Sequence, residues 1–327
     1  MLTNPMDILT MFPVRKTKSQ KQAFRDAVCA YAEKLGYPVT VEAGSFGCRN
    51  VIFGDPEQAK YLVTAHYDTC ARMLLPNFIT PCNVTGYLMY QLCLIFLIFA
   101  GAITLSVVES AVIAGIAVLL GNHLGDGWIL FVGLVAPSLY GFSALLLVLL
   151  MIVGPANKNN ANDNTSGVVT LLEIARTLPE NQRHKVCFVL FDLEEAGLIG
   201  SGSYRKKHKK ATDNQLVLNL DCVGDGDHIR MFPTKKLNKD RVKCTSLYKA
   251  CGFFGKKDLL VHEKGFYVYP SDQKHFPYGV GICALNRRKK LLYLSRIHTK
   301  KDTVLDITNV NILRAALTTF ICRDEVN

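Results

Sequence analysis

Seven side chains that can bind metal ions or move protons are spread over five short motifs of the sequence. Imidazole nitrogens and carboxylate oxygens are usual ligands of catalytic Zn2+, and such sites also need a base that accepts a proton from water. The set is therefore large enough for a pair of divalent ions, with carboxylates left over for proton transfer. Its members are His66, Asp68, Asp163, Glu194, Glu195, Asp221 and His298.

The motif HYD places two of these side chains close together. Residues i and i+2 of a β-strand project to the same side, so His66 and Asp68 would face one pocket. A metal-bound imidazole usually donates its second N–H group to a carboxylate, and Asp68 suits that role or the orientation of a base. A histidine and an aspartate at the surface end of a strand would give the same pattern without a function.

The three central motifs each allow a chemical and a structural interpretation. Asp163, in NDNTSG at the expected start of a helix, could be shared by two cations or could cap the helix. Glu194 and Glu195 are adjacent and cannot point the same way, so one could bind metal while the other acts as the base. Solvated surface acids are the alternative for this pair. Asp221 ends an apolar run, where a buried charge is unfavourable unless it is hydrogen-bonded or coordinated. His298 lies in a polar loop that gives no signal of its own.

The intervening sequence predicts an α/β fold. Buried strands alternate with helices, so we expect a mostly parallel central sheet covered by helices on both faces. Three of the motifs follow the carboxyl ends of expected strands, which is where open α/β sheets bind their ligands. The expected helices are 19–35, 165–178 and 307–322, and the expected strands are 39–42, 48–53, 60–66, 185–191, 215–220, 280–285 and 291–294.

An almost uncharged stretch, 84–154, separates the first two motifs. Residues 84–108 and 127–156 contain no charged side chain, and a helix of either length can cross a hydrocarbon core of about 30 Å. The motifs before and after the stretch must reach the same metal ions, so the number of crossings must be even. We therefore expect an inserted two-span transmembrane helical hairpin, with 110–124 as an interfacial or re-entrant piece. The catalytic domain would comprise 1–83 and 155–327. A buried helical hairpin in a soluble protein is the alternative.

Loop charges predict the orientation of this insert. The connection 109–126 contains no Lys or Arg, whereas Arg72, Lys158 and Arg176 flank the other side. The positive-inside rule then places the catalytic domain in the cytoplasm. Eleven cysteines without a CxxC pair are consistent with reduced thiols in that compartment.

The net charge of +11 is concentrated partly in two basic clusters, 205–210 and 287–290. These clusters could be solvated faces, or they could contact anionic lipid headgroups. Nucleic acid is not expected as a partner, because no recognisable nucleic-acid-binding module accompanies the charge.

The order HxD, NDNxSG, EE, D and H resembles the motif order of the two-zinc aminopeptidase family. That family includes bacterial leucyl aminopeptidases, glutamate carboxypeptidase, single-zinc glutaminyl cyclases and non-enzymatic transferrin receptors. The resemblance covers roughly 1–83 and 155–327. The segment SDQKHF is similar to the family's SDHxxF segment near the substrate pocket, but Gln273 stands where a histidine is expected. The apolar insert replaces a short loop of the family.

The resemblance implies a role for each of the seven residues. His66 and Asp221 would hold one ion, and Glu195 and His298 would hold the other. Asp163 would bridge the two ions.

The two remaining carboxylates would act in catalysis. Glu194 would be the general base, and Asp68 would support the neighbouring histidine.

We therefore expect a metal-dependent hydrolase, specifically a membrane-anchored di-metal aminopeptidase. It would bind two divalent ions, expected to be Zn2+ with Mn2+ or Co2+ as alternatives. Its partners would be peptides, including hydrophobic or membrane-associated ones, and the lipid bilayer. The alternatives are a glutaminyl cyclase, which is an acyltransferase, and a receptor or scaffold with an inactive peptidase fold. A carboxypeptidase would need a cationic clamp, for which Arg287, Arg288 and Arg296 are candidates.

Overall fold

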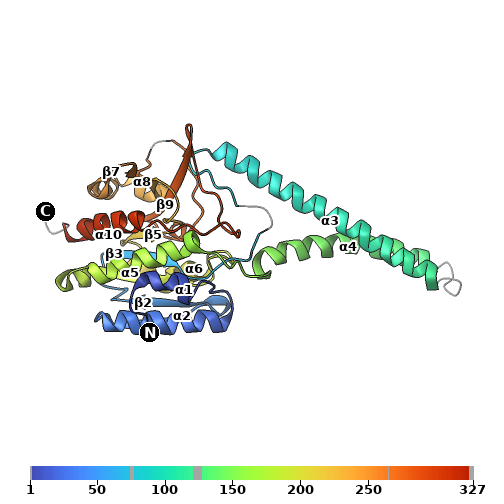
Figure 1. Cartoon of the computed structure of the whole chain (residues 1–327), viewed down its shortest axis with the longest axis horizontal. Coiled ribbons are helices and arrows are strands. Elements are labelled where there is room, and N and C mark those ends of the chain that lie inside the picture. The colour runs from blue at the N-terminus through green and yellow to red at the C-terminus, as the bar shows by residue number, and fades with distance from the viewer. Residues whose placement is uncertain (1, 74–76, 121–126, 264, 324–327) are drawn as a thin grey trace. The chain divides into compact units, whose positions relative to one another are not determined.

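The chain forms two compact units in the computed structural model (Figure 1). One unit combines Met1–Val84 with Ala156–Asn327 and is an α/β domain built on a ten-stranded sheet. The other unit, Thr85–Pro155, contains two long helices. The residues that the structure describes are 2–73, 77–120, 127–263 and 265–323.

The sheet is mixed: its central strands are parallel, and most of the strand pairs towards its edges are antiparallel. Its strand order is β1-β2-β4-β3-β5-β9-β6-β8-β7, with β10 paired to β9. The run β4-β3-β5-β9 is parallel, and β6 is parallel to β8. The pairs β1-β2, β2-β4, β9-β6, β8-β7 and β9-β10 are antiparallel. The strands are β1 (Val39–Ala43), β2 (Arg49–Phe53), β3 (Tyr61–His66), β4 (Val186–Phe191), β5 (Leu216–Leu220), β6 (His228–Pro233), β7 (Gly252–Phe254), β8 (Lys257–Val261), β9 (Gly279–Arg288) and β10 (Leu291–Tyr293).

The expectation of a mostly parallel sheet is therefore correct for the centre and wrong for the sheet as a whole. Parallel neighbours need a crossover, and the described helices α5 (Gly167–Thr177) and α6 (Ile199–Lys207) provide it after β3 and after β4. The strands β6, β7 and β8 were not expected from the sequence. Polar side chains at His228, Arg230 and Asp258 break their apolar pattern, and these side chains instead form an ion-paired group.

Helices cover both faces of the sheet, as expected for strands that are apolar throughout. On one face, α2 (Lys18–Lys34), α5 and α10 (Ile307–Cys322) contribute to a large apolar core that includes Val63 of β3. On the other face, Leu62 of β3 packs in a second core with Tyr204 of α6 and Phe276. Because successive strand residues point to opposite faces, both cores share the same strands.

The first long helix begins and ends close to where the sequence predicted. Thr17 caps α2 through a reciprocal pair of hydrogen bonds with Gln20, so the helix starts one residue before the expected Ser19. At its other end the chain turns through Gly36, whose φ of +86° lies in the left-handed region.

One part of the expected arrangement of the insert is contradicted by the unit Thr85–Pro155. A single helix, α3, runs without interruption over Val84–Leu120, so 110–120 is not a separate interfacial or re-entrant piece. The helix contains no proline, and its lone acidic residue Glu109 accepts a hydrogen bond of 3.0 Å from the hydroxyl of Ser143. Residues 121–124 of the expected piece lie outside the described residues. The second helix, α4, spans Gly127–Val153.

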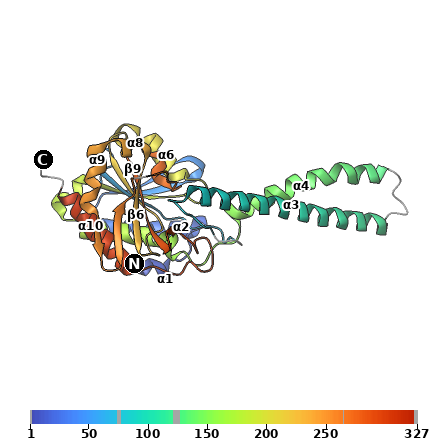
Figure 2. The same cartoon turned by 90° about the horizontal axis from the view of Figure 1, so that it is seen from above.

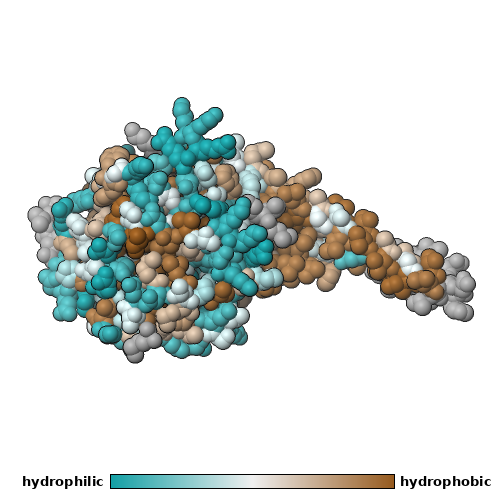
Figure 3. All heavy atoms as spheres, viewed as in Figure 1, coloured by the Kyte–Doolittle hydropathy of each residue, from teal (hydrophilic) through white to brown (hydrophobic). Residues whose placement is uncertain are grey.

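The two helices run side by side (Figure 2). Ile95 and Phe99 of α3 face Ala144, Leu145 and Val148 of α4. The surfaces turned away from this contact are apolar as well, as the brown colour along this unit shows (Figure 3). At 37 residues, α3 is about 55 Å long.

One described helix meets the length and composition of a membrane span. It is Val84–Ile116, with a mean hydropathy of 2.4 and only 6% of its most apolar window buried.

Candidate metal centre

The structure brings all seven predicted side chains together at the carboxyl edge of the parallel strands. His66 is the last residue of β3, and it lies beside Phe191, the last residue of β4. The Glu194–Glu195 pair follows β4, and Asp221 follows β5. His298 comes from the loop after β10. Parallel neighbours end at the same edge of a sheet, which is why residues distant in sequence converge here.

Asp163 lies at the centre of this group, between the two imidazoles. Its Oδ1 lies 3.3 Å from Nε2 of His66, and its Oδ2 lies 2.9 Å from Nε2 of His298. The Asp163 side chain is only 5% exposed. Each oxygen of one carboxylate therefore faces a different histidine, which is the arrangement needed for a ligand shared by two ions.

Each histidine also faces a second carboxylate. Nε2 of His66 lies 3.6 Å from Oδ1 of Asp221, and Nε2 of His298 lies 3.2 Å from Oε2 of Glu195. Two ligands about 2.0–2.1 Å from a tetrahedral ion are roughly 3.3 Å apart, so these spacings suit two such ions. Among the described residues, Oε1 of Glu195 has no hydrogen-bond partner, although it is buried. The donor set thus fits a pair of divalent cations.

Several buried ionisable side chains lie close together in the site, and burial and their mutual contacts shift their pKa values. Burial raises the pKa of Glu194 well above its usual value and also raises the pKa of Glu195. Burial opposes ionisation of Asp163, but its contacts with His298 and His66 lower its pKa below the usual range. Burial alone would lower the histidine values, but the carboxylates around them raise the pKa of both His66 and His298.

Asp68 acts mainly on the glutamate pair rather than on the histidine. Its Oδ1 accepts the backbone N–H of Glu194 at 3.0 Å, and its Oδ2 accepts that of Glu195 at 3.2 Å. The ring Nδ1 of His66 lies 3.2 Å from the backbone oxygen of Asp68 and 3.7 Å from its carboxylate. The predicted support of His66 therefore comes from the carbonyl of Asp68, while the carboxylate holds the loop after β4.

Backbone conformations around the site are unusual. Leu193, Cys222 and His298 have φ values of 55°, 55° and 61°, which place them in the left-handed region although none is glycine. Two of these residues directly neighbour predicted site residues, and the third is one of them. Strained backbone of this kind concentrates at functional sites, where the surrounding structure holds it in place.

Two buried ionisable residues that the sequence did not indicate hold the site in place. Asp302, 2% exposed, accepts the backbone N–H groups of Asn162 at 2.8 Å and Asp163 at 3.1 Å. Burial and the nearby Asp163 carboxylate raise the pKa of Asp302 to about 8. The only sequence signal for it was its position four residues after His298.

Arg15 is the second of these residues. Its guanidinium is fully buried and donates to the backbone oxygen of Tyr67 and to Oγ1 of Thr165, at 3.1 Å. It therefore connects the end of the HYD strand to the segment after Asp163. Burial lowers the pKa of Arg15 to about 10, and the carboxylates of Asp68 and Asp163 oppose this change. Nothing in the sequence around Arg15 marked it.

The SDQKHF segment lies at the site, although its histidine is replaced. Gln273 is buried and accepts a hydrogen bond from Asn219 of β5 at 3.2 Å. Its neighbour Asp272 is completely buried, and burial raises the pKa of Asp272 to about 7. His275 instead contacts the hydroxyl of Ser201 at 2.9 Å.

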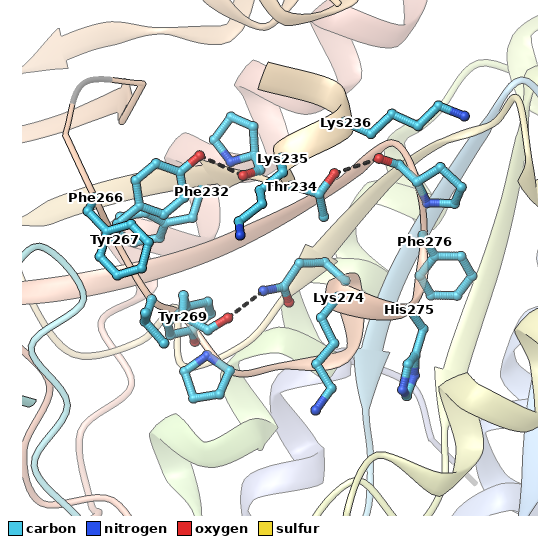
Figure 4. Close-up of a pocket in the computed structure, with 15 residues that line it drawn as sticks. Phe232, Thr234, Lys235, Lys236, Phe266, Tyr267, Tyr269, Lys274, His275 and Phe276 are labelled. Atoms are coloured by element: carbon cyan, nitrogen blue, oxygen red, sulfur yellow. Dashed lines mark hydrogen bonds between the residues drawn. The ribbon is translucent and has the colours of Figure 1, made fainter. Parts of the chain in front are cut away.

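A cavity of about 670 Å³ lies beside this segment (Figure 4). Aromatic side chains form much of its wall, and Lys235 and Lys274 extend from its lining. None of the seven predicted residues lines it directly. The hydroxyl of Tyr269, a lining residue, donates to the backbone oxygen of Asp221 at 2.9 Å, so the wall of the cavity adjoins the metal-type ligands.

The arginines considered as a carboxylate clamp are not arranged as one. Arg296 forms an ion pair of 2.7 Å with Asp225. Arg287 and Arg288 are exposed at the end of β9.

Comparisons with known proteins agree with the resemblance seen in the sequence. The sequence model of Peptidase family M28 matches residues 150–320. Aminopeptidase YwaD of Bacillus subtilis is 40% identical over 67 residues, which cover 20% of this chain and only 15% of that protein. These matches confirm the expected family resemblance and, at the level of the family, the expectation of a metal-dependent hydrolase.

Two solved structures share the fold. The LapA aminopeptidase of Legionella pneumophila has a TM-score of 0.53 at 13% identity, covering 97% of this chain and 68% of that chain. A glutaminyl cyclase of Macrostomum lignano has a TM-score of 0.51 at 11% identity, covering 98% and 89%. At such low identities these likenesses concern the fold alone.

The role of Asp302 can be tested by replacing its carboxylate with an amide. We expect Asp302→Asn to weaken metal binding by about 10–100-fold, because it loses one acceptor for the backbone that carries Asp163. The measurement is metal affinity by chelator competition, with circular dichroism to verify folding. Asp306→Asn is the matched control, since Asp306 caps α10 and asparagine caps equally well. Unchanged affinity in a folded Asp302→Asn protein would contradict this role.

Proposed function

Because the chain belongs to peptidase family M28, we propose that it is a membrane-anchored aminopeptidase that requires two divalent metal ions. The observation that carries the proposal is the position of Asp163, whose two oxygens face His66 and His298 separately. A single ion would need only one of these contacts. The reaction would be hydrolysis of the N-terminal peptide bond of a peptide.

Five residues would hold the two ions. His66 and Asp221 would bind one ion, Glu195 and His298 the other, and Asp163 would bridge them. We expect zinc, because the set combines imidazole with carboxylate, although manganese and cobalt accept the same ligands. When bound, such ions polarise a carbonyl group and make a bound water more acidic.

Glu194 would move the proton during hydrolysis. Its carboxylate lies within 4.8 Å of ligand atoms of His66 and Asp221, and Asp68 holds its backbone. In this position Glu194 would accept a proton from the attacking water and then deliver it to the leaving amine. Asp68 would keep the carboxylates of Glu194 and Glu195 in their separate places, so that each performs one task.

The cavity beside the SDQKHF segment would receive the side chain of the substrate. Phe232, Phe266 and Tyr267 supply apolar contact area, and Tyr269 connects the wall to Asp221. Pockets that bind small groups in proteins usually combine apolar walls with a few polar groups in this way.

The unit Thr85–Pro155 would anchor the enzyme in a membrane. The long apolar helix α3 supports this, because its side chains are exposed without a soluble core around them. Both α3 and α4 would cross the bilayer as a hairpin. The loop charges then orient the catalytic domain towards the cytoplasm.

A glutaminyl cyclase is the second candidate, because one shares the fold over 98% of this chain. Such an acyltransferase needs only one zinc, whereas the five side chains that converge here would supply ligands for two ions. The number of bound ions therefore separates the two functions.

Metal analysis tests the two-ion site. We expect the purified protein to contain two divalent ions per chain, and chelation to remove both the ions and the peptidase activity. Zinc should restore the activity, as measured with an aminoacyl fluorogenic substrate. One ion per chain in a folded protein would favour the cyclase, and none would favour a scaffold.

Substitution of the adjacent glutamates separates the ligand from the base. Glu195→Gln should weaken metal binding, because it removes an anionic ligand. Glu194→Gln should retain both ions but lower turnover by about 10²–10⁴-fold, the usual contribution of a positioned acid–base group. Bound metal and kcat are the two measurements. Metal loss in Glu194→Gln with retention in Glu195→Gln would mean that the two roles are reversed.

Replacement of Thr85–Pro155 by a short Gly/Ser linker tests the anchor. We expect this variant to leave the membrane fraction and to keep its activity on a small soluble aminoacyl substrate. Relative to the intact protein, it should lose activity on a hydrophobic peptide partitioned into liposomes. An unchanged ratio of the two activities would show that the helices act as an anchor only, and persistent membrane attachment would contradict the anchor.

A further inference from the structure

The turn between β9 and β10 concentrates four positive charges at one point. Arg288 pairs with Leu291 in antiparallel register, so Lys289 and Lys290 form a two-residue turn. With Arg287 and Arg288 they make four consecutive basic residues, all of them exposed. The hairpin projects from its unit in Figure 1, and the corresponding projection in Figure 3 is strongly hydrophilic. We refer to residues 287–290 as the basic tip.

The basic tip is not neutralised by the protein. In the part of the chain that the structure describes, no carboxylate forms an ion pair with any of its four side chains, and Arg287 donates only to the backbone oxygen of Lys289. The other basic cluster, 205–210, is different: Arg205 pairs with Asp213, and Lys207 lies 2.6 Å from Glu42. Like charges held together in a tight turn repel one another, so the tip is suited to a polyanionic partner.

The same hairpin is joined to the segment that leads into α3. Leu294, directly after β10, exchanges backbone hydrogen bonds of 3.1 and 2.8 Å with Ile79. The rings of Phe78 and Tyr293 lie 5.5 Å apart, centroid to centroid. The apolar helix begins at Val84, only a few residues after Ile79. The path from the basic tip to α3 runs through Leu294 and Ile79 to Val84. Even fully extended, at about 3.5 Å per residue, it keeps the tip within roughly 40 Å of the first turn of α3.

From this connection we infer that the basic tip binds the headgroups of anionic phospholipids on the side of the bilayer that α3 enters. The inference rests on the proposed membrane anchoring. Phosphate and carboxylate groups of such lipids accept hydrogen bonds from guanidinium and ammonium groups, and a negative membrane surface attracts basic residues beside a spanning helix. The contact would hold the catalytic domain at the headgroup layer, in addition to the covalent link.

Limited trypsin digestion of the full-length protein in lipid nanodiscs tests the contact, because both basic clusters are trypsin sites. One set of discs contains phosphatidylcholine only, and the other contains roughly a third phosphatidylserine. At low salt we expect cleavage at 287–290 to be at least about tenfold slower in the anionic discs. Cleavage at 205–210 serves as the internal control and should be equal in both. Salt at about 0.5 M should abolish the difference, since it shortens the Debye length to a few ångströms.

A paired substitution identifies the charges responsible. Lys289→Gln with Lys290→Gln should reduce the protection of the remaining arginine sites, whereas Lys206→Gln with Lys210→Gln should leave it unchanged. Equal cleavage of the tip in both discs at low salt would overturn the lipid contact while leaving the anchor intact. Failure of the protein to enter discs would instead contradict the anchor, and the lipid contact with it. Protection in phosphatidylcholine discs by a soluble oligonucleotide, but none by phosphatidylserine, would overturn the lipid contact in favour of a soluble polyanion.

Discussion

The arrangement of the catalytic unit depends on one buried carboxylate, that of Asp163. Two histidines that are far apart in the sequence face it, and Asp302 holds its loop by accepting the backbone N–H of Asp163. A carboxylate without compensation in such a place would be strongly unfavourable, because burial penalises the charged form. The residues that compensate this charge must therefore be held at fixed positions. The parallel strands that end at this edge of the sheet hold them there. The carboxyl ends of these strands are thus the part of the sheet that positions the site.

The different positions of the two adjacent glutamates follow from the hydrogen bonds that hold their backbone. Glu194 and Glu195 are neighbours in sequence, but Asp68 accepts both of their backbone N–H groups and so fixes the loop that carries them. One carboxylate then faces the side of His66 and the other the side of His298. Rigid placement of this kind matters more than the strength of any single contact, because proton transfer requires donor and acceptor at hydrogen-bond distance.

The sequence was sufficient to predict the convergence of the site but not its supports. Candidate ligands such as Asp221 follow buried apolar strands, and the ends of such strands share an edge, so local pattern and topology together locate them. Arg15 and Asp302 act through contacts with residues far away in sequence, which no local pattern records. The strands β6 and β8 around Arg230 were missed for a similar reason, since an ion pair rather than apolar alternation joins them. The continuity of α3 was missed because apolar composition does not indicate where a helix ends.

The position of the apolar insert has a consequence for how the protein is made. The strand that carries His66 is synthesised before the insert, whereas both of its neighbours in the sheet, β4 and β5, are synthesised after it. The nascent N-terminal segment therefore has no partners for its central strand until the helices have left the ribosome. Contacts between residues so far apart in the sequence form late, and apolar surface stays exposed until they form. Biosynthesis of the catalytic unit is thus ordered in time: the apolar helices emerge first, and the sheet that carries the candidate metal ligands at its edge is completed afterwards.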